Sequence, residues 1–205
     1  MTAFLKTVAK LILSPWVRAR GPRGGIYLTF DDGPHPAHTR AVLDALRRHD
    51  AKATFFMIGE EMERYPAIVA EAVAQGHAIG FHSYRHQHLA ELTATEMLSD
   101  LRQVSSVAQR VGLAFTLYRP PYGEMSFRRV LWCMTHGVRT IMWSLESRDS
   151  FVANADELIE QLSPERVHDG DIILLHDDTA LTVSALPTVL ERLRRGGFHF
   201  GILSK

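Results

Sequence analysis

The chain has 205 residues, a length that suits one domain able to bury a sizeable core. Lys plus Arg number 23 and Asp plus Glu number 23, so the formal net charge is zero, and the basic surplus typical of a nucleic-acid-binding protein is missing. The single cysteine, Cys133, excludes an intramolecular disulfide and a cysteine-based zinc site. Any bound metal must therefore be held by histidine and carboxylate side chains.

Residues 1–24 form an amphipathic and basic segment that differs from the rest of the chain. Apolar side chains recur at helical spacing between Phe4 and Ile12, and Lys6 and Lys10 lie off that face. The two lysines make the apolar run too short and too broken for a transmembrane helix, and the segment is a poor signal peptide. We expect a helix that packs on the domain or, as the alternative, makes peripheral contact with an anionic membrane through residues 1–20. Without a signal peptide or disulfides, we expect a cytoplasmic protein, whether or not it is membrane-associated.

From residue 25 to 205 the sequence predicts a single domain in which short apolar strands alternate with amphipathic helices. Strands are expected at 26–30, 53–58, 78–82, 115–118, 140–144, 171–176 and 198–202. Helices are expected at 41–48, at 65–75, at 93–111 behind a Thr93–Glu96 capping box, and at 187–195. This alternation predicts an α/β fold with a parallel sheet or barrel.

Polar residues gather at the carboxyl ends of the expected strands, where parallel barrels place their catalytic groups. Five strand ends carry such residues, in chain order Asp31 with Asp32, His82, Arg119, Asp149 and His176. Scattered surface charges would rarely coincide with one rim of a barrel in this way. The pattern therefore predicts one shared site at that rim.

Two of these strand ends, together with the residues that follow them, favour a metal site. Two adjacent carboxylates, Asp31 and Asp32, are costly directly after a buried strand unless a cation compensates them. His82 and His86 are four residues apart, a spacing that suits a shared zinc ion on a helical turn. Taken singly, an acidic turn explains the carboxylates equally well, and a lone histidine pair is more often structural or exposed than a metal site. His77 and His88 are further candidates nearby. Asp32 with His82 and His86 makes a zinc-competent set that leaves room for water.

Four motifs in order make the sequence resemble a known family. They are TFDDGP at 29–34, HSYRH at 82–86, RPPYG at 119–123 and LLHD at 174–177. The chain resembles the polysaccharide deacetylases, the NodB-homology domain of carbohydrate esterase family 4, over roughly residues 25–205. The resemblance implies a distorted (β/α) barrel with about seven parallel strands. It also implies a divalent metal, most often Zn²⁺, with Co²⁺ or Ni²⁺ as alternatives.

The resemblance further assigns roles to particular residues. Asp32, His82 and His86 correspond to the metal ligands. Asp31 corresponds to the general base that deprotonates the metal-activated water, and Arg119 to a partner that holds Asp31 in place and keeps it ionised.

The resemblance also assigns roles to five other positions, two of them in general acid catalysis and three in the substrate pocket. His176 corresponds to the general acid, and Asp149 to the carboxylate that orients and charges it. The backbone N–H of Tyr122 would stabilise the oxyanion, with Pro120 beside it in the substrate-binding loop. Leu174 would line the pocket for the acetyl methyl group.

One segment departs from the family pattern. Ser150 stands where a tryptophan is usual, and Glu146 where an aspartate is common. Phe151 could replace some of the lost apolar surface, and Arg148 could pair with Asp149 and divert it from His176. These changes affect the expected groove wall and the tuning of the general acid, but not the metal ligands.

The resemblance implies a hydrolase that removes N-acetyl groups from N-acetylhexosamine units of an acetylated glycan or oligosaccharide. Alternatives are an O-acetyl ester hydrolase on a xylan-like glycan and a deformylase of a lipid-linked aminosugar, which the N-terminal segment would suit. A non-catalytic carbohydrate-binding domain is the alternative from a different class. It would be expected to have lost Asp31 or a metal ligand, and none is lost.

Overall fold

Eight short strands run parallel in one sheet within residues 15–205, the part of the chain that this computed structural model describes. The amphipathic helix predicted between Phe4 and Ile12 lies outside the described residues. The strands are β1 (Val17–Arg18), β2 (Tyr27–Asp31), β3 (Thr54–Met57), β4 (Ala78–Phe81), β5 (Leu117–Tyr118), β6 (Arg139–Ile141), β7 (Leu145–Glu146) and β8 (Ile172–His176).

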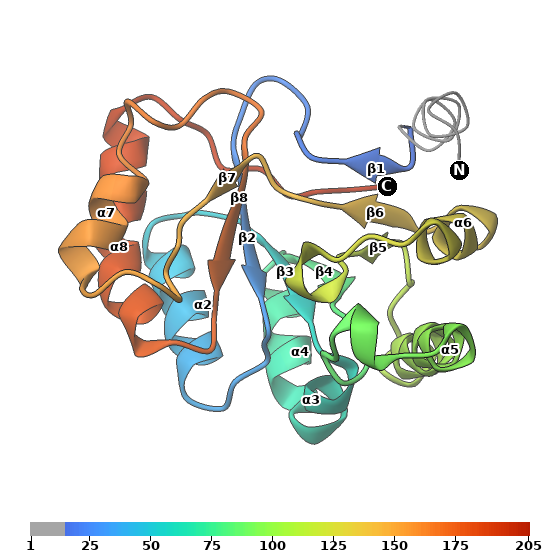
Figure 1. The fold of residues 1–205 in the computed structure, drawn as a ribbon. Helices are drawn as coiled ribbons and strands as arrows, with labels where there is room; N and C mark the ends of the chain where they lie inside the picture. Colours follow the sequence, from blue (N-terminus) through green and yellow to red (C-terminus); the bar gives the residue numbers. More distant parts are fainter. Residues whose placement is uncertain (1–14) are drawn as a thin grey trace, which may run out of the picture.

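The strand order is β1-β6-β5-β4-β3-β2-β8-β7, and every pairing within it is parallel. The sheet curls into an open barrel with its helices on the outside, so the predicted single-domain (β/α) barrel is confirmed (Figure 1). The central strand β2 lies between β3 and β8, and its last residue, Asp31, is in register with His176 of β8. Two residues of the predicted site are thereby fixed side by side.

Seven α-helices and two short 3₁₀ helices connect the strands of the described chain. They are α2 (His38–Arg48), α3 (Gly59–Arg64), α4 (Pro66–Ala74), η1 (Leu89–Glu91), α5 (Ala94–Arg110), η2 (Pro121–Gly123), α6 (Phe127–Thr135), α7 (Ala155–Gln161) and α8 (Ala180–Arg195). The predicted capping box is present at the start of α5. The Thr93 hydroxyl accepts from the Glu96 N–H at 3.2 Å, and the Glu96 carboxylate accepts from the Thr93 N–H at 2.8 Å.

The prediction of a strand at 198–202 was wrong. Phe200 forms a single bridge with Ile26, and the chain then turns across the amino ends of two strands, where the Leu203 N–H donates to the Thr54 hydroxyl at 3.0 Å. The segment is apolar because it covers the bottom of the barrel: Leu203 is 2% exposed. Its hydrophobic pattern therefore reflects burial rather than strand pairing.

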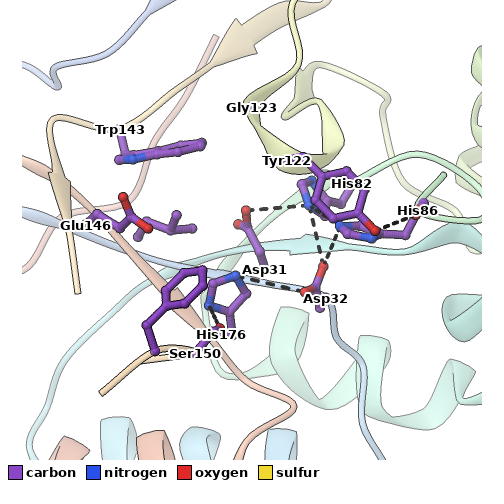
Figure 2. Close-up of a pocket in the computed structure, with 12 residues that line it drawn as sticks. Asp31, Asp32, His82, His86, Tyr122, Gly123, Trp143, Glu146, Ser150 and His176 are labelled. Carbon is purple, nitrogen blue, oxygen red and sulfur yellow. Dashed lines mark hydrogen bonds and ion pairs between the residues drawn. The ribbon is translucent and has the colours of Figure 1, made fainter. Parts of the chain in front are cut away.

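The predicted strand at 140–144 is replaced by two shorter strands. β6 ends at Ile141, and β7 begins at Leu145 on the opposite side of the sheet order, beside β8. The connecting residues 142–144 thus cross the gap in the open barrel. This crossing and β7 after it place Trp143 and Glu146 across the pocket from His82 and His86 (Figure 2).

The amino-terminal part of the described chain also joins the sheet. Val17 and Arg18, which we assigned to the N-terminal segment, pair in parallel with Thr140 and Ile141 of β6. None of the helices found between residues 15 and 205 is long and apolar enough to cross a membrane.

Candidate active site

A cleft of about 350 Å³ opens at the carboxyl ends of the strands (Figure 2). The loops after β2, β4, β5 and β6 and the ends of β7 and β8 contribute to it, as expected for a parallel barrel. Twelve residues line the cleft: Asp31, Asp32, His82, His86, Tyr122, Gly123, Trp143, Glu146, Ser150, Phe151, Leu174 and His176.

Asp32, His82 and His86 converge on one point of this cleft. The Nε2 atoms of the two histidines lie 3.2 Å apart, and Asp32 Oδ1 lies 3.1 Å from His86 Nε2 and 3.5 Å from His82 Nε2. One ligand atom from each residue falls within 4.8 Å of the others. The spacing of the three atoms suits a single ion between them.

The chemistry of this group also fits a divalent metal. The Oδ1 atom of Asp32 is buried without a hydrogen-bond partner. His82 Nδ1 donates to the Arg119 carbonyl at 2.8 Å, which leaves the lone pair of Nε2 free for an ion. Burial lowers the pKa of His82 to about 3, so its imidazole is neutral at pH 7, as a ligand must be.

The other two candidate histidines lie outside the group. His77 Nδ1 accepts from the Ala53 N–H at 3.2 Å, and its ring packs against Phe55. His88 contacts the Glu124 carboxylate at 3.2 Å and stacks on the ring of Tyr122. The structure therefore narrows the histidine set to His82 and His86.

The loop between the two histidines is held by side-chain contacts. The Ser83 hydroxyl accepts from the His86 N–H at 2.8 Å, and Asp100 of α5 accepts from the Tyr84 N–H at 2.9 Å. Asp32, Ser83 and His86 all have positive φ values, of 74°, 67° and 53°. Such conformations are costly for non-glycine residues and need support from their surroundings.

Asp31 lies beside the metal group and contacts Arg119, as predicted. Arg119 donates to Asp31 Oδ1 at 2.6 Å and to the Thr29 hydroxyl at 2.8 Å, and both charged side chains are buried. Burial raises the pKa of Asp31 above the usual aspartate range, and the Arg119 guanidinium opposes that shift. The second carboxylate oxygen of Asp31, Oδ2, lies 3.7 Å from His82 Nε2 and so faces the cleft.

His176 and Asp149 form the second buried polar pair. Asp149 Oδ1 lies 2.7 Å from His176 Nδ1, while its Oδ2 accepts from the Thr182 hydroxyl at 2.8 Å. Burial disfavours the imidazolium, but the Asp149 hydrogen bond and charge outweigh it and raise the pKa of His176 to about 9. No ion pair within residues 15–205 joins Arg148 to Asp149, so the diversion of Asp149 that we considered does not occur.

The walls of the cleft agree in part with the predicted substrate residues. Leu174, only 5% exposed, lies on the lining, and so does Tyr122. Pro120 is buried and does not line the cleft, so it shapes the turn behind the wall rather than the wall itself. Phe151 is 75% exposed at the cleft, while the Ser150 hydroxyl lies 3.3 Å from His176 Nδ1.

Trp143 and Gly123 form a wall of the cleft that was not predicted from the sequence. Gly123 has a φ of +66°, and a Cβ there would lie 2.8 Å from the Trp143 ring. Only glycine therefore fits between the loop and the indole. The RPPYG motif contained this signal, because a glycine directly after the bulky Tyr122 indicates a special backbone conformation or a close approach.

Comparisons with known proteins point to one family. The family model described as polysaccharide deacetylase matches residues 18–141. A peptidoglycan-N-acetylglucosamine deacetylase of Bacillus cereus is 32% identical over 180 residues, which cover 85% of this chain and 65% of that protein. A chitooligosaccharide deacetylase of Azorhizobium caulinodans is 33% identical over 203 residues, covering 91% of this chain and 96% of that protein.

Solved structures give the same result for the fold. A peptidoglycan N-acetylglucosamine deacetylase crystallised with 4-naphthalen-1-yl-N-oxidanyl-benzamide superposes with a TM-score of 0.85 at 31% identity. The match covers 92% of this chain and 91% of that one. The chain spans less than two thirds of the Bacillus cereus relative but nearly all of the Azorhizobium relative.

Proposed function

The chain belongs to the polysaccharide deacetylase family, the NodB-homology domains of carbohydrate esterase family 4, and from that premise we propose that it hydrolyses N-acetyl groups on N-acetylhexosamine units of a glycan. One observation carries the proposal. Asp31 and His176 are in register on neighbouring strands, and both lie beside the Asp32–His82–His86 group. Asp31 is the proposed base and His176 the proposed acid. Amide hydrolysis needs a base and an acid on opposite sides of one carbonyl carbon.

Asp32, His82 and His86 would hold a divalent metal in this proposal, and Zn²⁺ fits a set of two imidazoles and one carboxylate best. When bound, such an ion supplies Lewis acidity that activates water and polarises the acetyl carbonyl. The chain supplies the remaining groups.

Asp31 would take the proton from the attacking water. Its Oδ2 faces the cleft, and its Oδ1 is held by Arg119, so the carboxylate cannot rotate away from the water. A carboxylate with a raised pKa is also a stronger base than a free aspartate. The backbone N–H of Tyr122, at the cleft, is the proposed donor to the oxyanion.

His176 would protonate the leaving nitrogen. With a pKa of about 9 it is an imidazolium at pH 7, and Asp149 on Nδ1 leaves the proton on Nε2 directed at the cleft. Asp149 acts through His176 and is a positioning residue. Leu174 would take the acetyl methyl group on the cleft floor.

The test is acetate release from a tetramer of N-acetylglucosamine, measured on chelated protein and on the same protein reloaded with Zn²⁺, Co²⁺ or Ni²⁺. We expect no release after chelation and restored release with at least one ion. His82→Ala should lose stoichiometric metal and activity together. Acetate release by the chelated protein at the full rate would contradict the proposal.

A further inference from the structure

We propose that His88 is a positioning residue of this site, which holds the ring of Tyr122 against the imidazole of His86 and so keeps the backbone N–H of Tyr122 at a fixed place relative to the metal group. In the proposed deacetylase function, on which this inference rests, that N–H donates to the oxyanion. His88 does not line the cleft, so it acts through Tyr122 rather than on the substrate.

The rings of the two proposed metal histidines are held in different ways. His82 Nδ1 donates to the Arg119 carbonyl at 2.8 Å, whereas His86 Nδ1 takes part in none of the hydrogen bonds found within residues 15–205. The His86 ring packs against Tyr122 instead, with ring centroids 4.6 Å apart (Figure 2). The Tyr122 hydroxyl also lies 3.4 Å from the His86 carbonyl. Tyr122 therefore takes the place of the outer partner that usually orients a ligand imidazole.

His88 stacks on the same tyrosine ring. The centroids of His88 and Tyr122 lie 3.5 Å apart, and the two planes differ by 10°. The Tyr122 ring thus contacts two imidazoles of one loop, those of His86 and His88. Because Tyr122 is 51% exposed, its side chain is free to turn away from His86 into solvent once the His88 ring is removed.

The loop that carries Tyr122 holds His88 at a second point. Glu124 Oε1 lies 3.2 Å from His88 Nδ1, and Glu124 Oε2 accepts from the Leu89 N–H at 2.5 Å. The Glu124 carbonyl accepts from the buried Arg129 of α6 at 3.2 Å. The loop therefore grips residues 88 and 89 through a ring and a carboxylate, and α6 anchors it from behind.

The backbone at Tyr122 needs such support. Its φ of 55° lies in the left-handed region, which is costly for a bulky residue and persists only where the surroundings enforce it. A relaxed loop would turn the Tyr122 N–H away from the metal group. A misplaced donor loses much of its effect on the transition state, so the contacts of His88 should affect the rate.

The experiment compares two substitutions at His88 with a matched control. His88→Ala removes the ring, and His88→Phe keeps a ring that can stack on Tyr122. His136→Ala is the control, because His136 stacks on Trp132 with centroids 3.9 Å apart and lies outside the cleft. One readout is kcat and KM for acetate release from the N-acetylglucosamine tetramer, on full-length proteins shown to hold one Zn²⁺ per chain. The other is the Zn²⁺ affinity of the chelated proteins, measured by competition with a coloured chelator.

We expect His88→Ala to lower kcat about threefold to tenfold, with a smaller change in KM, and to weaken Zn²⁺ binding by a similar factor. Factors of this size correspond to the loss of one aromatic pair. His88→Phe should keep most of both values, and His136→Ala should match the wild type. A merely structural role for His88 would lower the unfolding midpoint but leave kcat and Zn²⁺ affinity of the folded protein unchanged.

A double-mutant cycle tests whether His88 acts through Tyr122. In a Tyr122→Ala background the ring that His88 holds is already missing, so adding His88→Ala should lower kcat no further. Losses that add in the double variant would mean that the two residues act independently.

The outcomes separate the two proposals. Three results would each overturn the inference while leaving the deacetylase function standing: wild-type kcat or Zn²⁺ affinity in His88→Ala, equal losses in His88→Ala and His88→Phe, or additive losses in the double variant. No acetate from any metal-loaded protein, wild type included, would overturn the proposed function and the inference with it.

Discussion

Asp149 should control His176, the proposed general acid, through its short contact with the imidazole. Its oxygen lies 2.7 Å from His176 Nδ1, and this contact raises the pKa of His176 to about 9 against the effect of burial. A general acid must carry its proton, so the active fraction falls as the pH rises through that pKa. The alkaline limb of the pH–rate profile therefore reports on Asp149.

Asp149→Asn should move this alkaline limb to lower pH. The substitution removes the negative charge, so burial is no longer outweighed and the imidazolium is lost earlier as the pH rises. The measurement is kcat between pH 6 and pH 10, and Asp156→Asn on α7 is the control. An unshifted alkaline limb in Asp149→Asn would separate Asp149 from the acid step.

Phe151 should contribute to glycan binding rather than to chemistry. It is 75% exposed at the cleft, and aromatic contacts of this kind are worth about 0.5–1.5 kcal/mol. Phe151→Ala is expected to raise KM about threefold to tenfold with little change in kcat. Phe127→Ala is the matched control, because Phe127 is 56% exposed on α6, outside this cleft. Equal KM values for the two variants would remove Phe151 from the binding surface.

At the scale of elements, α5 supports the loop that carries two of the proposed metal ligands, His82 and His86. Asp100 on α5 accepts from the Tyr84 N–H at 2.9 Å, midway between His82 and His86. The loop contains two residues with positive φ, Ser83 and His86, and needs such anchoring. A helix distant in sequence thus fixes the geometry of the metal group.

Asp100→Ala should weaken metal binding by about tenfold, because the loop between His82 and His86 loses an anchor; this is the lower end of the effect seen when a ligand loses its own hydrogen-bond partner. Asp100→Asn keeps an oxygen that accepts the same N–H and should retain most of the affinity. A competition titration against a coloured chelator measures both. Wild-type affinity in Asp100→Ala would show that α5 is dispensable for the loop.

The sequence predicted the central strands better than the edge strands. β2, β3 and β4 are apolar runs buried in the middle of the sheet, and such runs are visible in the sequence. β1 and β7 have two residues each, and their pairing depends on backbone neighbours rather than on side-chain pattern. The segment at 198–202 misled because an apolar run that covers the barrel bottom has the same composition as a strand.

The residues of the candidate site also divide into those that the sequence predicted and those that it did not. The residues that reach into the cleft with charged or ligating groups lie within short motifs and were predicted. Their supports, Asp100, Thr182 and Trp143, lie outside those motifs, and only the fold shows what each of them contacts at the site. Local patterns carry no information about such long-range contacts.

At the scale of the whole molecule, the barrel should fold without a metal. Its core is an apolar interior in which Phe30 and Phe55 stack with ring centroids 5.1 Å apart. The proposed metal ligands are not part of this core. The metal group involves loops at one rim. Binding should therefore add to stability without being required for the fold.

We expect an ion at about 100 times its Kd to stabilise the protein by about 2.7 kcal/mol, as mass action requires. Denaturant unfolding with and without Zn²⁺ measures this difference. His82→Ala should show no metal-dependent shift in its unfolding midpoint. An equal shift in that variant would place the stabilising ion elsewhere.

The most direct measurement of the central claim compares wild type with Asp31→Asn at matched metal content. Acetate release from the N-acetylglucosamine tetramer is followed on both proteins after each has been shown to hold one ion per chain. We predict release by the wild type and a rate about 10²–10⁴-fold lower in Asp31→Asn, because the base is lost while Asp32, His82 and His86 remain. Equal rates for the two proteins, or no release by metal-loaded wild type, would contradict the account.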